Sequence, residues 1–124
     1  MSVSFAAVVL GSPDPVALAG FYRELLGWET VEEQPDWVRL RDPRRERPGL
    51  SFQLEPPQVP PAWPARPGAP QMQLHVDLLS TDLAADVDRA VRLGARLEAD
   101  QRQEGVRVLR DPDGHPFCLF VAGA

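Results

Sequence analysis

Two side chains with reactive chemistry lie in the second half of the chain, each in an apolar segment with the composition of a β-strand. His75 lies in Met72–Leu79, and the single cysteine, Cys118, lies in Phe117–Val121. An imidazole can serve as a general base near neutral pH, or it can be a structural group hydrogen-bonded across strands. A strand cysteine is commonly an inert small apolar residue, and it becomes a nucleophile only beside a base or cation. Both readings remain open for each residue.

Alternation along Met72–Leu79 assigns its side chains to two faces. One face is apolar and is expected to lie under a helix; it consists of Leu74, Val76 and Leu78. The other face is polar and consists of Gln73, His75 and Asp77. His75 therefore faces either a concave ligand surface or solvent.

A second candidate binding surface lies on the segment Asp36–Arg41. Trp37 and Arg39 alternate with apolar residues there, so one face is aromatic and cationic. Such a face suits a planar or anionic ligand, although arginine stems can also cover an ordinary solvated face. The following basic stretch, Arg41 to Arg47, could hold a phosphate, but we expect a solvated hairpin loop.

Composition excludes several classes of function. The net charge is -5 and the pI is about 4.9, which disfavours partners such as nucleic acid or an anionic membrane. One cysteine cannot form an intrachain disulfide, and no P-loop, GxGxxG, GxSxG or HExxH motif is present. The longest apolar run, Val3 to Leu10, is too short for a membrane span and lacks the flanks of a signal peptide. We expect a cytoplasmic protein with a small-molecule partner.

Each half of the chain begins with the same order of signals. In the first half an apolar segment, Val3–Leu10, is followed by a Ser-Pro-Asp-Pro turn and a helix that ends at Gly27. In the second half Met72–Leu79 is followed by a Ser-Thr-Asp turn and a helix that ends at Gly94. The apolar face of the first helix consists of Leu18, Phe21, Tyr22, Leu25 and Leu26. The apolar face of the second helix consists of Leu83, Val87, Ala90 and Val91.

Three strand candidates follow each helix. They are Trp28–Glu33, Asp36–Arg41 and Leu50–Glu55 in the first half, and Arg96–Asp100, Val106–Arg110 and Phe117–Val121 in the second. Equivalent landmarks are separated by nearly constant offsets: 68 residues between the capping aspartates, 67 between the glycines and 69 between the two Arg-Asp-Pro motifs. The sequence therefore predicts a duplicated βαβββ unit.

A proline-rich segment separates the two halves. Seven of the 14 prolines lie between Pro56 and Pro70, where helix and central strand are both disfavoured. A polyproline recognition segment is one interpretation, and a stiff spacer is the one we favour. We expect a single domain with modules 1–54 and 72–124 joined by the connector 55–71.

Several segments resemble the glyoxalase/bleomycin resistance/dioxygenase superfamily, also called vicinal oxygen chelate proteins. They are SPDPVALAGFYRELLGWE in the first half, and MQLHVDLLSTDLAADVDRAVRLGARL and VRVLRDPDGHPFCLF in the second. The likeness is greatest to the glyoxalase-like branch of small two-module proteins. It implies an α+β fold in which two βαβββ modules form a curved mixed-sheet cup with helices outside. Many relatives pair, so the resemblance also implies a homodimer.

The resemblance also implies four positions for metal ligands, one on the first and one on the last strand of each module. Carried onto this sequence, the positions are Ala7, His75, Gln53 and Cys118. Alanine has no lone pair and a neutral amide is a poor ligand for a transition metal. We therefore predict no metal and no cofactor.

The expected function is binding of a small molecule in the cup. Trp37 would stack on the ligand, Arg39 would pair with an anionic or carbonyl group, Gln53 and His75 would orient it, and Cys118 would line the site. The alternative is a metal-independent lyase or isomerase of the same superfamily that uses His75 as its general base.

Overall fold

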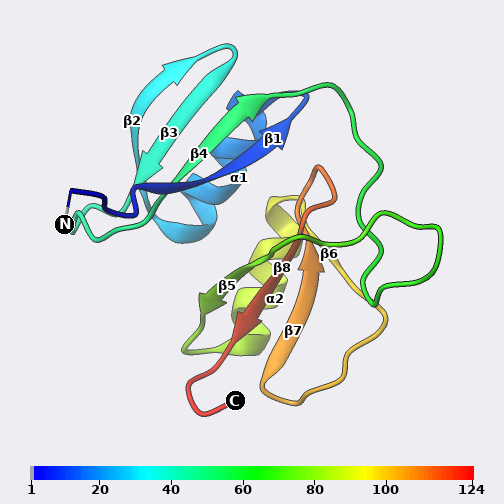
Figure 1. Cartoon of the computed structure of the whole chain (residues 1–124). Helices are drawn as coiled ribbons and strands as arrows, with labels where there is room; N and C mark the ends of the chain where they lie inside the picture. The colour runs from blue at the N-terminus through cyan, green and yellow to red at the C-terminus, as the bar shows by residue number, and fades with distance from the viewer. Residues whose placement is uncertain (1) are drawn as a thin grey trace. The chain divides into compact units, whose positions relative to one another are not determined.

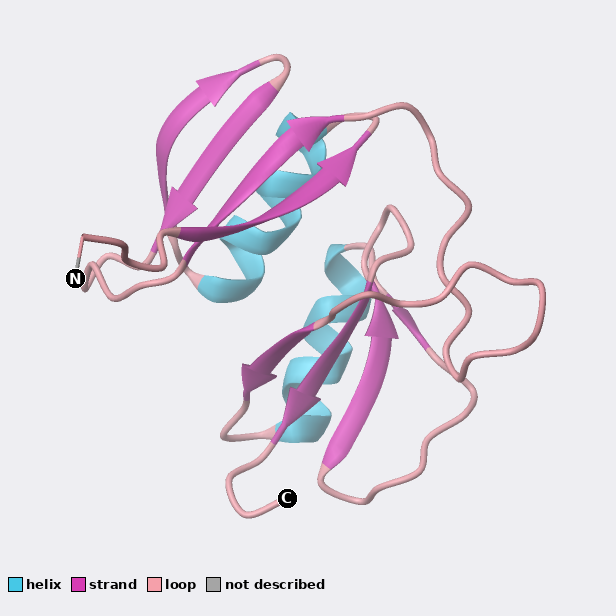
Figure 2. Cartoon of the chain, viewed as in Figure 1, coloured by secondary structure: helices cyan, strands magenta, loops and turns pink. Residues whose placement is uncertain are grey.

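The computed structural model describes residues 2–124 and has an α+β fold built from two βαβββ modules (Figures 1 and 2). This architecture confirms the predicted fold class and duplication. The chain forms two compact units, one ending at Gln58 and the other running from Val59 to Ala124. Neither helix among the described residues has the length and apolar character needed to cross a membrane.

The first module is a four-stranded sheet with one helix on one face. Its elements are β1 (Ala7–Ser12), α1 (Pro15–Leu26), β2 (Glu29–Gln34), β3 (Trp37–Arg41) and β4 (Gly49–Leu54). The strand order is β1-β4-β3-β2, with β1 parallel to β4 and the other pairs antiparallel. Tyr22 of α1 stacks on Phe52 of β4 at a centroid distance of 5.8 Å, so the helix covers this face. The opposite face of the sheet is left for other contacts.

The second module repeats this topology. Its elements are β5 (Val76–Leu79), α2 (Leu83–Leu93), β6 (Arg96–Leu97), β7 (Val106–Arg110) and β8 (Pro116–Phe120), in the order β5-β8-β7-β6. The first strand begins later than predicted, and Leu74 lies before it with 59% of its surface exposed. The predicted placement of Leu74 under the helix is therefore wrong.

Both helices begin with the same capping chemistry. Asp14 and Asp82 each accept a hydrogen bond, 3.2 Å long, from the backbone amide three residues later. The hydroxyls of Ser12 and Ser80 each accept a hydrogen bond from the backbone amide of the capping aspartate. Gly27 ends the first helix with a φ of +68°, which glycine adopts without steric cost. These local bonds explain why the two turns could be matched in the sequence.

Strand β6 has only two residues because the side chain of Gln101, rather than a longer β6 backbone, forms hydrogen bonds with the backbone of β7. Gln101 donates from Nε2 to the carbonyl oxygens of Glu98 and Val108, at 2.8 and 2.9 Å. The amide of Val108 donates back to Gln101 Oε1 at 2.9 Å. Because this side chain satisfies the backbone of β7, residues 98–105 leave the sheet as a loop.

The proline-rich segment does not act only as a spacer, because residues from Val59 onward belong to the second unit. Arg110, whose side chain is only 9% exposed, donates to the carbonyl oxygens of Pro61 and Gly114 at 2.6 and 3.0 Å. The same guanidinium pairs with Glu98 at 2.7 Å. The segment is thereby attached to the module through Pro61.

The core of the second module lies between α2 and the sheet, and Leu109 of β7 is completely buried there. We predict that Leu109→Ala lowers the free energy of unfolding by about 2–5 kcal/mol, because it removes buried methyl groups and leaves a cavity. Leu97→Ala, at a position 47% exposed, is the matched control and is expected to cost much less. Urea unfolding followed by circular dichroism measures both. Equal losses would contradict the placement of Leu109 in the core.

Candidate functional site

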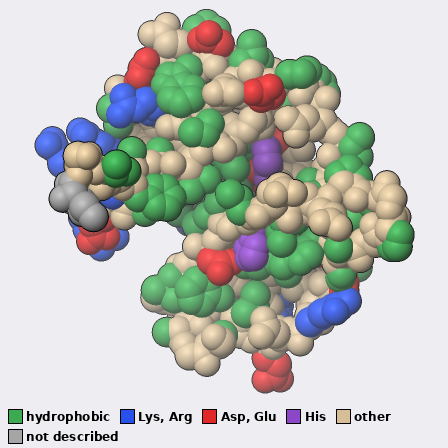
Figure 3. Space-filling view, viewed as in Figure 1, with side chains coloured by type: hydrophobic (Ala, Val, Ile, Leu, Met, Phe, Trp, Pro, Cys, Tyr) green, Lys and Arg blue, Asp and Glu red, His purple; other side chains and the backbone are tan. Residues whose placement is uncertain are grey.

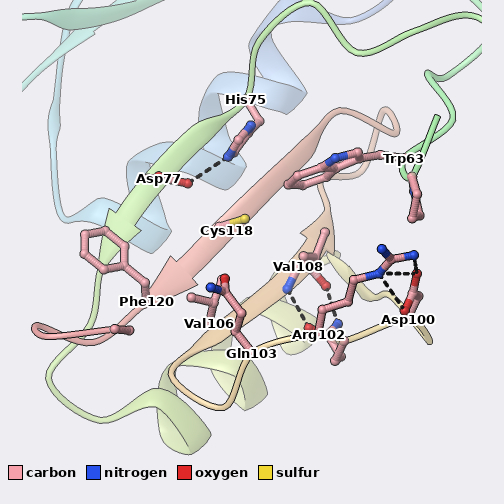
Figure 4. Close-up of a pocket in the computed structure, with 13 residues that line it drawn as sticks. Trp63, His75, Asp77, Asp100, Arg102, Gln103, Val106, Val108, Cys118 and Phe120 are labelled. Carbon is pink, nitrogen blue, oxygen red and sulfur yellow. Dashed lines mark hydrogen bonds and ion pairs between the residues drawn. The ribbon is translucent and has the colours of Figure 1, made fainter.

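A cavity of about 520 Å³ lies within the second module. Its walls come from the proline-rich segment, the start of β5, the 98–105 loop, and strands β7 and β8 (Figure 4). Apolar and aromatic side chains make up much of the wall, namely Trp63, Val106, Val108 and Phe120. The volume is in the range of small-molecule sites.

Three polar side chains converge on this cavity. Strands β5 and β8 are parallel, and their register places Asp77 directly beside Cys118. His75 precedes Asp77 by two residues and lies on the same side, and its Nε2 is 3.0 Å from Asp77 Oδ1. Potential ligand atoms of the three residues all lie within 4.8 Å of one another (Figure 4). The topology therefore joins His75 and Cys118 through Asp77, a residue that sequence reasoning placed on the His75 face without assigning it a role.

Trp63 covers the imidazole of His75. Their ring centroids are 4.6 Å apart with an angle of 36° between the planes. His75 is half-buried, between the indole and the carboxylate of Asp77 (Figure 4). The ring contact with Trp63 and the 3.0 Å contact with Asp77 together restrain the orientation of the imidazole.

Cys118 is buried, and its environment disfavours the thiolate. Burial raises the pKa of the Cys118 thiol to about 11, with further contributions from the negative charge of Asp77 and the hydrogen bond to it. The thiol is therefore protonated at neutral pH. It donates its hydrogen bond to Asp77 at the cavity wall, and it is a poor nucleophile.

Trp37 and Arg39 belong to a different cavity, one of about 620 Å³ within the first module. Trp37 is half-buried on β3, and Arg39 is paired with Glu32 at 3.3 Å. Val9 and Ser51, on β1 and β4, line the same surface. The structure thus gives each module its own concavity, with Trp37 and Arg39 in one and His75 and Cys118 in the other.

Gln53 is exposed on β4 and donates to Glu55 Oε1 at 2.5 Å; it does not line the cavity of its own module. Strand pairing places Ser51 opposite Arg39, as Cys118 lies opposite Val108. The sequence match of Gln53 with Cys118 is therefore displaced by two residues, and Ser51 is the equivalent position. A two-residue displacement keeps the same face of a strand, so alternation alone could not reveal it.

The four-position metal set implied by the resemblance does not fit a transition metal. Ala7 has no ligand atom, and a neutral amide at Gln53 or a hydroxyl at Ser51 is a weak donor. Among residues 2–124, the group of potential metal ligands that lie close together is in the second module, where His75, Asp77 and Cys118 provide nitrogen, oxygen and sulfur. Binding by sulfur would require Cys118 to lose a proton that its surroundings retain.

Comparison with known proteins agrees with this fold. The family model described as glyoxalase-like domain matches residues 7–120. No curated protein sequence matches the chain significantly.

Similar solved structures cover nearly the whole chain at low identity. One is a glyoxalase/bleomycin resistance protein/dioxygenase family enzyme from Burkholderia phytofirmans PsJN, with a TM-score of 0.71 and 16% identity over 96% of this chain and 98% of that one. Another is a glyoxalase-related enzyme from Fulvimarina pelagi, with a TM-score of 0.68 and 19% identity over 95% and 87% of the two chains. A third is TnmS3, an antibiotic binding protein from Streptomyces sp. CB03234, with a TM-score of 0.59 and 20% identity over 98% of each chain. At these identities the likeness shows the fold alone.

The raised pKa of Cys118 is open to a direct measurement. We predict that Asp77→Asn lowers the pKa of the thiol from about 11 but keeps it above 9.0, because the charge is lost while burial remains. Thiolate absorbance near 240 nm as a function of pH reports the midpoint. Asp100→Asn, which alters a carboxylate paired with Arg102 in the same cavity, is the matched control. An unchanged midpoint in Asp77→Asn would contradict the assignment.

Proposed function

We propose a ligand-binding function for this chain, which belongs to the family of glyoxalase-like domains. The observation that carries the proposal is the 520 Å³ cavity of the second module, where an aromatic and aliphatic wall meets three convergent polar side chains. Apolar walls with a few placed polar groups are typical of small-molecule sites. One solved structure of similar fold is an antibiotic binding protein, which is consistent with this use of the scaffold.

Each side chain has a role that follows from its chemistry. In the second module, Trp63 offers an aromatic face, His75 a hydrogen-bonding imidazole, and Cys118 a protonated thiol. In the first module, Trp37 would stack on a planar group and Arg39 would pair with an anionic or carbonyl group. An orienting role for Gln53 stays a prediction of the sequence.

Ligand binding in this proposal does not use a catalytic metal. The first module supplies no strong ligand at Ala7 or Ser51, and the thiol of Cys118 holds its proton at neutral pH. Recognition instead depends on shape, aromatic contact and hydrogen bonds, which these side chains supply without an ion.

A second candidate is a metal-independent lyase or isomerase with His75 as general base. The distance of 3.0 Å between His75 and Asp77 favours it, because a carboxylate that orients an imidazole is a usual partner of a catalytic base. In that case His75→Gln would abolish turnover of a bound substrate while its binding persists. A ligand recovered unchanged after prolonged incubation would favour the binding protein.

We also propose that the protein forms a homodimer. Large apolar side chains are exposed on both modules, among them Phe5, Leu74 and Leu79. Burying such side chains between two copies would remove apolar surface from water. Light scattering at micromolar concentration is predicted to give the mass of two chains, and a monomeric mass would contradict the proposal.

The binding proposal predicts a defined response to ligands and variants. In a thermal-shift screen of planar aromatic compounds and peptide antibiotics, a specific ligand is expected to raise Tm. Calorimetry should then show that Trp63→Leu and His75→Gln each raise its Kd by about tenfold, a loss of roughly 1.4 kcal/mol.

Two controls accompany this measurement. Trp28→Leu, which alters a tryptophan that lines neither cavity, should leave the Kd unchanged. Dialysis against a chelator should also leave it unchanged, and elemental analysis should find no stoichiometric metal. Zn, Fe, Ni or Mn bound stoichiometrically and lost in His75→Ala together with ligand binding would contradict the metal-independent proposal.

A further inference from the structure

The cavity of the first module carries charge opposite to that of the chain as a whole. The chain has a net charge of -5, yet four arginines and a single acidic residue line this cavity. The arginines are Arg39, Arg41, Arg45 and Arg47, and the acidic residue is Glu46. Basic side chains gather on this module toward its N-terminal end (Figure 3). A concave surface of this kind concentrates a positive field and attracts anions.

The basic loop between β3 and β4 was expected to be solvated, but part of it lines the cavity. The carboxylate of Asp42 accepts hydrogen bonds from the amide and the guanidinium of Arg44, which lower the pKa of Asp42. The amide of Arg45 donates to the carbonyl oxygen of Asp42 at 2.7 Å. These bonds shape the turn and engage Arg44, while Arg45 and Arg47 contribute to the cavity wall.

Arg45 has a backbone φ of +63°, a region that residues other than glycine rarely adopt. Unfavourable backbone conformations of this kind are frequent at ligand sites, where the surrounding structure maintains them. Across residues 2–124 the guanidinium of Arg45 makes no ion pair or hydrogen bond. Among the described residues it therefore has no partner to lose when an anion binds.

Within the described residues, the side chains of the other arginines of this cavity make exposed interactions. Arg39 pairs with Glu32 at 3.3 Å and Arg41 with Glu29 at 3.1 Å, both partly exposed to solvent. Arg47 donates to the hydroxyl of Ser4 at 3.1 Å. Exposed pairs of this kind are weak, so an incoming anion can replace them.

Trp37 adds an aromatic surface to this positive cavity, and Val9 and Val31 add apolar area. A planar ring can lie against the indole while a carboxylate in the plane of that ring meets guanidinium groups, which bind carboxylates through paired hydrogen bonds. We propose that the first-module cavity is a binding site for an aromatic carboxylate, with Trp37 on the ring and Arg45 and Arg47 on the carboxylate. This inference rests on the proposed ligand-binding function and defines the ligand class of that module.

The first test compares three probes on the full chain by isothermal titration calorimetry. They are 2-naphthoate, its uncharged analogue naphthalene-2-carboxamide, and inorganic phosphate. We expect 2-naphthoate to bind at least tenfold more tightly than either of the others, and to weaken as NaCl rises from 20 to 200 mM. Equal affinity for the carboxylate and the amide would overturn the inference, as would phosphate binding as tightly as 2-naphthoate.

Variants then locate the site. R45Q/R47Q should raise the Kd for 2-naphthoate about tenfold, whereas R66Q/R92Q removes the same charge outside this cavity and should have little effect. E46Q removes the single acidic side chain of the wall and should tighten binding, a gain that a folding defect cannot imitate. Equal effects of the two double variants would show attraction by net charge alone and overturn the inference.

Trp37→Leu should weaken the binding of 2-naphthoate and of the amide alike, since both use the ring contact. If Trp63→Leu abolishes 2-naphthoate binding while R45Q/R47Q retains it, the probe occupies the second-module cavity; the inference then fails and the proposed function stands. If R45Q/R47Q and E46Q change the Kd for 2-naphthoate as expected, but neither Trp63→Leu nor His75→Gln weakens the binding of any compound, the second-module proposal fails. The first-module site then stands.

Discussion

The buried guanidinium of Arg110 is the interaction on which the second module's cavity depends. A charged group removed from water is costly unless its donors are satisfied, and Arg110 bonds to Glu98, Pro61 and Gly114. These partners come from three separate segments, so one side chain determines where the 98–105 loop begins and where the proline-rich segment attaches. Trp63 follows Pro61 by two residues and reaches His75 as a result. The place of Trp63 in the cavity wall therefore depends on the bond between Arg110 and Pro61.

The two modules share a backbone and differ on their concave faces. Capping aspartates, helix-ending glycines and sheet order recur, because these features satisfy backbone hydrogen bonds and bury one face of each sheet. Equivalent positions on the other face carry unrelated chemistry: Ala7 and His75, Val9 and Asp77, Ser51 and Cys118, and Arg39 and Val108. Positions that do not hold the fold together are free to define a site, which is why this fold supports many functions.

The polar groups of the second module form a linked set rather than independent reactive residues. Asp77 lies beside His75 and also accepts from the thiol of Cys118, so its charge orients the imidazole while it disfavours the thiolate. A cysteine and a histidine in one cavity would suggest a nucleophile and its base. Burial and the carboxylate between them instead keep the proton on the thiol of Cys118.

By itself the sequence determined the fold class and the duplication, because alternation, helical periodicity and capping act over a few residues. It also placed His75 and Asp77 on one face. Only the tertiary structure decided the rest. It matched Ser51 rather than Gln53 with Cys118, used the side chain of Gln101 in place of a longer β6, and placed Arg45 and Arg47 in a cavity wall. These outcomes depend on strand register and on bonds between distant residues, such as Arg110 and Pro61, which no local pattern encodes.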